Sequence, residues 1–191
     1  MKSTKSAILE HAELLIRTKG FSALSYNDLA NIIGITKAGI HYYFPTKESL
    51  ANVLISEYST KFSKTLYSIE KEQSCTKDRL LAYSAIFTQG HDNNVLPLCC
   101  AMAAERATLP LALQELSKKL FVIQLDWLTK VLEEAIQSGE GINIQPARNT
   151  AMFYLSTLEG ASLISWIFND RDPIIRAFNT ALETTFPNKL Y

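Results

Sequence analysis

The sequence predicts an all-α protein of about nine helices. Apolar residues recur at every third or fourth position through most of the chain, whereas the strict alternation typical of strands is nearly absent. The 191 residues are 47% hydrophobic and 20% charged, which is ordinary for a soluble protein and sufficient for a sizeable core. The chain contains no internal repeat and no low-complexity tract, so the helices are expected to differ from one another.

The first predicted helix covers residues 3–19. Ile8, Ala12, Leu15 and Ile16 fall on one stripe of this helix, because they are spaced by three, four or one positions. A single apolar stripe packs against a partner, and the partner expected here is the pair of short helices that follows.

Residues 25–44 predict those two short helices, joined by one tight turn. Ser25 can cap the first helix, because its side-chain oxygen can accept a hydrogen bond from a free amide of the first turn. Gly34 ends it, since glycine adopts a left-handed backbone without steric cost. Thr36 can cap the second helix, whose length Pro45 limits. Two helices of about eight residues with a short turn form the helix-turn-helix unit that binds in a DNA major groove.

The rest of the chain is punctuated by glycine, proline and polar stretches. Thr46 can cap a long helix, residues 71–77 form a polar linker, and breaks fall at Pro110 and before Pro173. Gly139 opens a loop that continues to Gln145, and Pro146 suits the first turn of the next helix. The predicted helices in this part of the chain cover about 47–70, 78–90, 97–108, 111–138, 146–169 and 174–186.

Candidate DNA contacts lie on and beside the second short helix. Lys37 can reach a guanine edge or a phosphate, and the small residues after it let the helix approach base edges closely. Ser25 and Thr36 are caps first and phosphate donors second, and Tyr43 and Phe44 are expected in the core rather than at the DNA. The predicted DNA-binding residues are Ser25, Thr36, Lys37, Ala38, Gly39, His41, Tyr42 and Lys47.

Charge is distributed unevenly although the formal net charge is zero. Residues 1–64 carry eight Lys or Arg against five Asp or Glu, and the remaining residues carry eleven against fourteen. The excess of positive charge therefore coincides with the predicted helix-turn-helix, where contacts to phosphates require it.

The run GFSALSYNDLANIIGITKAGIHYYFPTKESLANVL resembles the N-terminal DNA-binding domain of TetR-family transcriptional regulators (the TetR/AcrR type). The resemblance covers about the first third of the chain, and residues 98–110 are also similar to a segment of one subgroup. It implies three domains: a DNA-binding three-helix head over 1–46, a long linking helix over 47–70, and a ligand-binding and dimerisation domain over 71–191. It further implies a homodimer on double-stranded operator DNA, a small-molecule effector and a repressor function.

The family resemblance also suggests where dimer and ligand residues lie. Dimerisation in the family usually uses the last two long helices, where small residues permit close approach, although ordinary intramolecular packing is the alternative. The predicted interface residues are Gly160, Ala161, Leu163, Ile164, Ala177 and Ala181. The predicted pocket residues, apolar positions on helices that surround the ligand in the family, are Leu66, Phe87, Cys99, Met102, Trp127 and Phe153. Glu105 and Arg106 could orient a polar ligand group, lie on a solvated face or form an internal ion pair.

Other classes of function have less support. The sequence contains no glycine-rich phosphate loop, no CxxC or HExxH motif and no Cys/His grouping at metal spacing, so no enzyme, metal or cofactor is expected. Its start lacks the apolar core of a secretory signal, and the apolar stretch 151–168 is short and contains Glu159, so a cytoplasmic protein without a membrane partner is expected. Two alternatives remain open: a regulator that senses oxidants or electrophiles through Cys99 or Cys100, and a helical interaction module that does not bind DNA.

Overall fold

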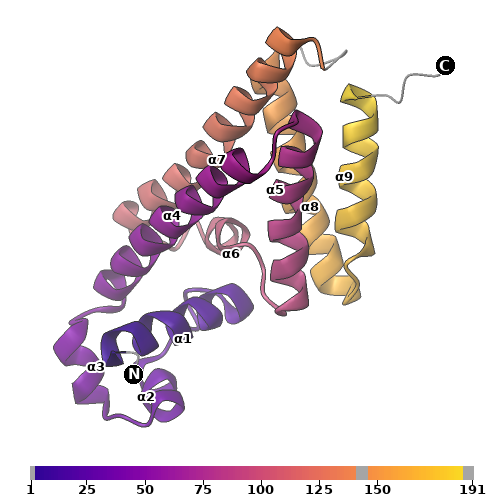
Figure 1. Ribbon diagram of the computed structural model, residues 1–191. Coiled ribbons are helices and arrows are strands. Elements are labelled where there is room, and N and C mark those ends of the chain that lie inside the picture. Colours follow the sequence, from indigo (N-terminus) through magenta and orange to yellow (C-terminus); the bar gives the residue numbers. More distant parts are fainter. Residues whose placement is uncertain (1–2, 141–145, 187–191) are drawn as a thin grey trace. The chain divides into compact units, whose positions relative to one another are not determined.

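The computed structural model describes residues 3–140 and 146–186, and every regular element within them is a helix (Figure 1). This confirms the predicted all-α fold. The nine helices in the described residues are α1 (Thr4–Lys19), α2 (Tyr26–Ile33), α3 (Lys37–Tyr43), α4 (Lys47–Glu72), α5 (Thr76–Asp92), α6 (Leu98–Ala104), α7 (Leu111–Ser138), α8 (Ala147–Phe168) and α9 (Asp172–Thr185).

The predicted helix ends around the helix-turn-helix are confirmed by the cap geometry. Ser25 Oγ accepts a hydrogen bond from Asn27 N at 3.2 Å, and Thr36 Oγ1 accepts one from Gly39 N at 3.1 Å. Gly34 ends α2 in the left-handed region, with φ 76° and ψ 35°. At the start of α4, Thr46 and Ser49 each donate a backbone N–H to the other's hydroxyl, which is a reciprocal capping box.

Other predicted boundaries are wrong in ways that have local causes. α5 begins at Thr76, not near residue 78, because Cys75 Sγ caps it by accepting from Asp78 N, so the predicted linker shortens to residues 73–75. α9 begins at Asp172 because Pro173 occupies its first turn, where a missing N–H breaks no helical bond. α6 ends at Ala104, and turns replace the predicted helix after it. The predicted loop after Gly139 lies largely outside the described residues.

The chain divides into two compact units. Unit 1 comprises Met1–Lys61 and Pro97–Leu120, and unit 2 comprises Phe62–Leu96 and Phe121–Tyr191. α6 therefore belongs to the same unit as the helix-turn-helix and packs against α1. This division follows spatial packing and does not coincide with the predicted functional domains, which stay a prediction.

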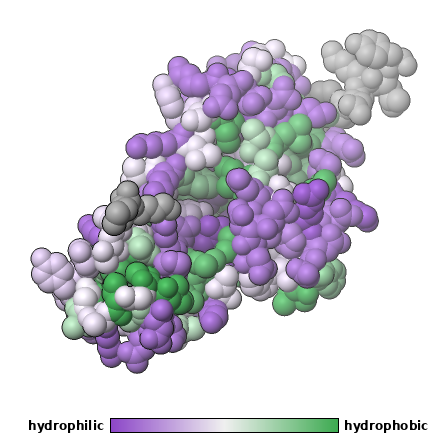
Figure 2. All heavy atoms as spheres, turned by 60° about the horizontal axis from the view of Figure 1, so that its bottom comes forward, coloured by the Kyte–Doolittle hydropathy of each residue, from purple (hydrophilic) through white to green (hydrophobic). Residues whose placement is uncertain are grey.

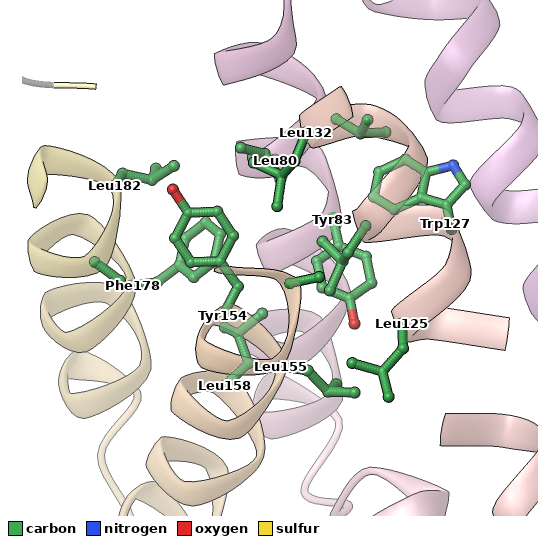
Figure 3. Packing of buried hydrophobic residues seen from close by; sticks show 14 of the residues in the cluster. Leu80, Tyr83, Leu125, Trp127, Leu132, Tyr154, Leu155, Leu158, Phe178 and Leu182 are labelled. Carbon is green, nitrogen blue, oxygen red and sulfur yellow. The ribbon is translucent and has the colours of Figure 1, made fainter. Parts of the chain in front are cut away.

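The core of unit 2 is built around aromatic side chains from four helices (Figure 3). Tyr83 of α5 stacks on Trp127 of α7 with ring centroids 5.3 Å apart, and Tyr154 of α8 lies 5.4 Å from Phe178 of α9. The hydroxyls of these two tyrosines are satisfied within the unit, because Tyr83 donates to Gln124 at 2.7 Å and Tyr154 bonds with Thr185. Leucine, valine and alanine side chains fill the space between these pairs.

Candidate nucleic-acid interface

The helix-turn-helix is held together by one residue that the sequence analysis did not single out. Tyr26, in the first turn of α2, donates its hydroxyl to the carbonyl oxygen of Phe44 at 2.9 Å, at the end of α3. Its ring packs edge-on against His41, with centroids 4.8 Å apart. Burial raises the pKa of the Tyr26 hydroxyl to about 12, so it stays a donor at neutral pH. One aromatic side chain thus joins the start of α2 to the end of α3.

Much of the surface of α3 is open to solvent. Lys37, Ala38 and His41 are exposed and Gly39 is half-buried, whereas Ile40 is fully buried and anchors the helix to unit 1. Tyr42 is 83% exposed, the largest exposure among the exposed large hydrophobic side chains of the described chain. A short, capped helix can enter a major groove when its exposed side chains are basic, small or hydroxyl-bearing, as they are here.

The aromatic residues at the end of α3 separate into core and surface. Phe44 is 2% exposed, as expected of a core residue. Tyr43, which was expected beside it, is 40% exposed, so that expectation is wrong. The reason is the helical rotation: Tyr43 lies next to Tyr42, with ring centroids 5.2 Å apart, on the outer side of α3.

Two further groups at this surface have defined partners. His41 Nδ1 lies 3.2 Å from the carbonyl oxygen of Pro45, and because a carbonyl only accepts, Nδ1 is the donor. Lys47, the first residue of α4, donates from Nζ to Ser22 O at 3.2 Å and lies over the Phe21 ring. An ammonium group has three donors, so this arrangement leaves Lys47 donors for a phosphate.

The predicted dimer residues fall into two groups. Ala161 and Ala181 are 4% and 1% exposed and belong to the core of unit 2, so their assignment to an intermolecular surface is wrong for this chain. Their small side chains serve the packing of α8 on α9 within the chain. Leu163 and Ile164 are about half exposed, Ala177 is half-buried, and a Cβ added at Gly160 would meet open space.

The predicted pocket residues do not form one described site. Leu66, Phe87 and Trp127 are buried in the core of unit 2, whereas Cys99 and Met102 are buried on α6 in unit 1. Phe153, also predicted as a pocket residue, is 48% exposed and does not share the core of unit 2 with the first three of these residues. At about 100° per residue, position 153 points well away from the α8 positions that enter the core.

The described residues include no group of three or more His, Cys, Asp or Glu side chains placed to hold a metal ion. One helix in them, α8, is long and apolar enough to cross a membrane by length and composition alone. Helices of a protein core meet the same criterion, and α8 packs against α9 and α5. The capped pair of helices α2 and α3, with the exposed side chains of α3, points most directly to a helix-turn-helix DNA-binding protein.

Comparison with known proteins agrees with that class. The family described as "Bacterial regulatory proteins, tetR family" matches residues 8–54. The chain is 38% identical over 81 residues to a probable HTH-type transcriptional regulator, YttP, of Bacillus subtilis, a match that covers 41% of this chain but only 39% of that relative. The matched segment of the curated relatives is thus well under two thirds of their length.

Solved structures match along nearly the whole chain. A TetR transcriptional regulator from Legionella pneumophila is 30% identical with a TM-score of 0.87, over 97% of this chain and 98% of that one. A TetR-family regulator from Agrobacterium tumefaciens is 28% identical with a TM-score of 0.92, over 95% and 97%. The chain belongs to the TetR family of transcriptional regulators, which bind DNA through the helix-turn-helix seen here in α2 and α3.

Proposed function

We propose that this protein is a cytoplasmic, homodimeric repressor that a small molecule releases from its operator. The exposed face of α3 carries the proposal, because Lys37, His41 and Tyr42 are presented to solvent by a helix whose other face is buried. Lys37 and the small residues after it approach base edges, and His41, Tyr42 and Lys47 contact phosphates. Ser25 and Thr36 act first as caps, which hold both helices at the required lengths.

The dimer is proposed to form through the outer face of α8. Apolar side chains reach the surface of the protein in several places, and Figure 2 shows those on one face of the molecule. The exposed apolar side chains of α8 form a stripe at helical spacing. Gly160 lies near the middle of this stripe and offers room for a second helix. The stripe consists of Met152, Phe153, Gly160, Leu163, Ile164 and Ile167. A two-fold axis would place two such stripes against each other as part of a four-helix interface.

The effector is proposed to act by shifting the population of two arrangements of the dimer. α4 runs without interruption from Lys47 to Glu72, so it begins in unit 1 at a proposed phosphate contact and ends in unit 2. Two heads fit successive major grooves only when they are about 34–36 Å apart. A ligand that binds better to another arrangement would move α4 and lose that spacing. Leu66, Phe87 and Trp127, which lie together in the core of unit 2, are the proposed pocket residues.

Burial of the thiols favours a ligand over an oxidant as the signal. Cys99 and Cys100 are 4% and 8% exposed, and a buried thiol is shielded from electrophiles. Cys75 is more accessible, but its hydrogen bond with the Asp78 side chain raises the pKa of the thiol above its usual value. A raised pKa leaves less of the reactive thiolate at neutral pH.

The test is binding to the DNA upstream of this protein's own gene, measured by fluorescence anisotropy with unlabelled nonspecific competitor. Specific binding by two protomers or a pair of dimers per site is expected, with an affinity that falls steeply as salt increases. Lys47→Ala should weaken binding without changing sequence preference and should lower the salt dependence, whereas Lys118→Ala, an exposed lysine of α7, is the control. Absence of specific sites, both here and in selection from random sequence, would favour a helical module without a DNA function.

A further inference from the structure

A glutamate far along the chain holds the turn between α1 and α2. Glu105, the first residue after α6, accepts the backbone N–H of Ser22 at 2.8 Å through Oε2, and the Ser22 hydroxyl donates to the same oxygen. Gly20 makes room for this carboxylate, because a Cβ at that position would clash with Glu105 Oε1. All three residues lie in unit 1, where α6 packs against α1. Residues 20–22 of the turn thus bind the carboxylate of Glu105.

The same turn also contacts Lys47, a residue proposed to bind a phosphate. The carbonyl oxygen of Ser22 accepts from Lys47 Nζ at 3.2 Å, and the ammonium lies 4.9 Å from the centroid of the Phe21 ring. Ser22 therefore donates its backbone N–H and its hydroxyl to the Glu105 carboxylate, and its carbonyl oxygen accepts from the Lys47 ammonium. Hydrogen bonds to ionised partners are roughly twice as strong as neutral ones. The position of Lys47 consequently depends on a turn that Glu105 holds.

We propose that Glu105 is a positioning residue for DNA binding, which acts by holding residues 20–22 in the conformation that places Lys47 for a phosphate. This inference rests on the proposed role of Lys47 at the operator. A lysine side chain loses rotamer freedom when it binds, and a side chain that is already placed loses less. Glu105 is therefore expected to contribute to affinity without touching DNA, and only as long as Lys47 is present.

A double-mutant cycle on operator DNA tests this dependence. Glu105→Gln keeps the size of the side chain and removes its charge, and it should weaken binding by about three- to tenfold, the range of the net contribution of a typical hydrogen bond. In the Lys47→Ala background the same substitution should change affinity by less than about twofold. Ser22→Ala, which removes only the hydroxyl donor, should act in the same direction with a smaller effect. Glu115→Gln is the matched control, because Glu115 is an exposed carboxylate on α7 in the same unit.

The outcomes separate failure of the inference from failure of the proposed function. If Lys47→Ala weakens binding but Glu105→Gln binds like the unchanged protein, the positioning role is overturned. Additive effects of the two substitutions would also overturn it, since a general loss of structure does not depend on Lys47. If Lys47→Ala leaves affinity and salt dependence unchanged, the proposed phosphate contact fails and the positioning role fails with it.

A readout without DNA tests the contact itself. Hydrogen exchange of the Ser22 amide should accelerate at least several-fold in Glu105→Gln, whereas the amide of Asn27, which donates to Ser25 Oγ, should exchange at an unchanged rate. Equal acceleration at both amides would indicate that the whole head has loosened, and no change at Ser22 would show that the carboxylate does not hold the turn. Either result would overturn the proposal.

Discussion

Substitution of Tyr26 by phenylalanine isolates one hydrogen bond of the helix-turn-helix. The variant keeps the ring, and with it the edge-on contact to His41, but removes the hydroxyl that donates to Phe44 O at 2.9 Å. Tyr26 is 6% exposed and Phe44 is 2% exposed, so water does not readily replace the missing donor. The change therefore tests a contact between α2 and α3 without opening a large cavity.

The expected loss in the free energy of unfolding is about 1–2 kcal/mol. A net contribution of about 0.5–1.5 kcal/mol is usual for a hydrogen bond, and an acceptor left unsatisfied in the interior raises the cost toward about 2 kcal/mol. For a chain of this size, each kcal/mol lowers the melting temperature by about 2–4 °C. Loss of the bond should also weaken operator binding, since the end of α3 is less firmly held.

Urea unfolding followed by circular dichroism, together with calorimetry, measures this loss. The midpoint should fall with an unchanged dependence on denaturant, as expected when stability changes but the exposed surface does not. Tyr42→Phe is the matched control, because its ring is 83% exposed and removal of its hydroxyl should leave the midpoint where it is. If Tyr26→Phe is as stable as the unchanged protein, or if both variants lose the same stability, the reasoning about this bond is refuted.

Three further predictions concern DNA, assembly and pH. Lys37→Ala should weaken operator binding by about tenfold. If Lys37 contacts a guanine, the variant should also lose sequence preference at one base pair; if Lys37 contacts a phosphate, the slope of log affinity against log salt concentration should fall by about one. Unchanged binding would exclude both contacts. Ile164→Glu places a charge in the α8 stripe and should shift sedimentation toward a monomer, whereas a dimer of unchanged affinity would locate the interface elsewhere. The pKa of Glu140 is lowered by its hydrogen bonds with Thr76 and Ser138, so its contribution to stability is present above its unfolded pKa and is lost as the pH falls through the folded value. Acid titration of stability should therefore be shallower in Glu140→Gln, and identical titrations would refute this.

Much of the head was predictable because its signals act over a few residues. Ser25, Gly34 and Thr36 each act on backbone groups within three or four positions, and the structure places all of them where the sequence indicates. The same locality explains the missed starts of α5 and α9. A cysteine that caps a helix and a proline tolerated in a first turn are weaker signals than serine or glycine, yet they obey the same rule.

The face that each helix presents was less predictable. α8 has apolar residues on most of its surface, and spacing alone does not say which of them meet α9 and which meet a second chain. Ala161 and Ala181 look like interface residues by size but are buried within the chain, whereas Phe153 looks like a core residue by chemistry but is half exposed. Only the packing of neighbouring helices distinguishes these cases.

The sequence by itself determined the all-α class, the helix-turn-helix and the basic, small and hydroxyl-bearing residues of α3, because caps, turns and periodicity arise from interactions between near neighbours. The tertiary structure decided which apolar faces are buried and brought Glu105 to Ser22 across 83 positions of sequence. Contacts of that kind depend on how α1 and α6 pack. No local pattern encodes that packing, because it results from the combined burial of every helix in the unit.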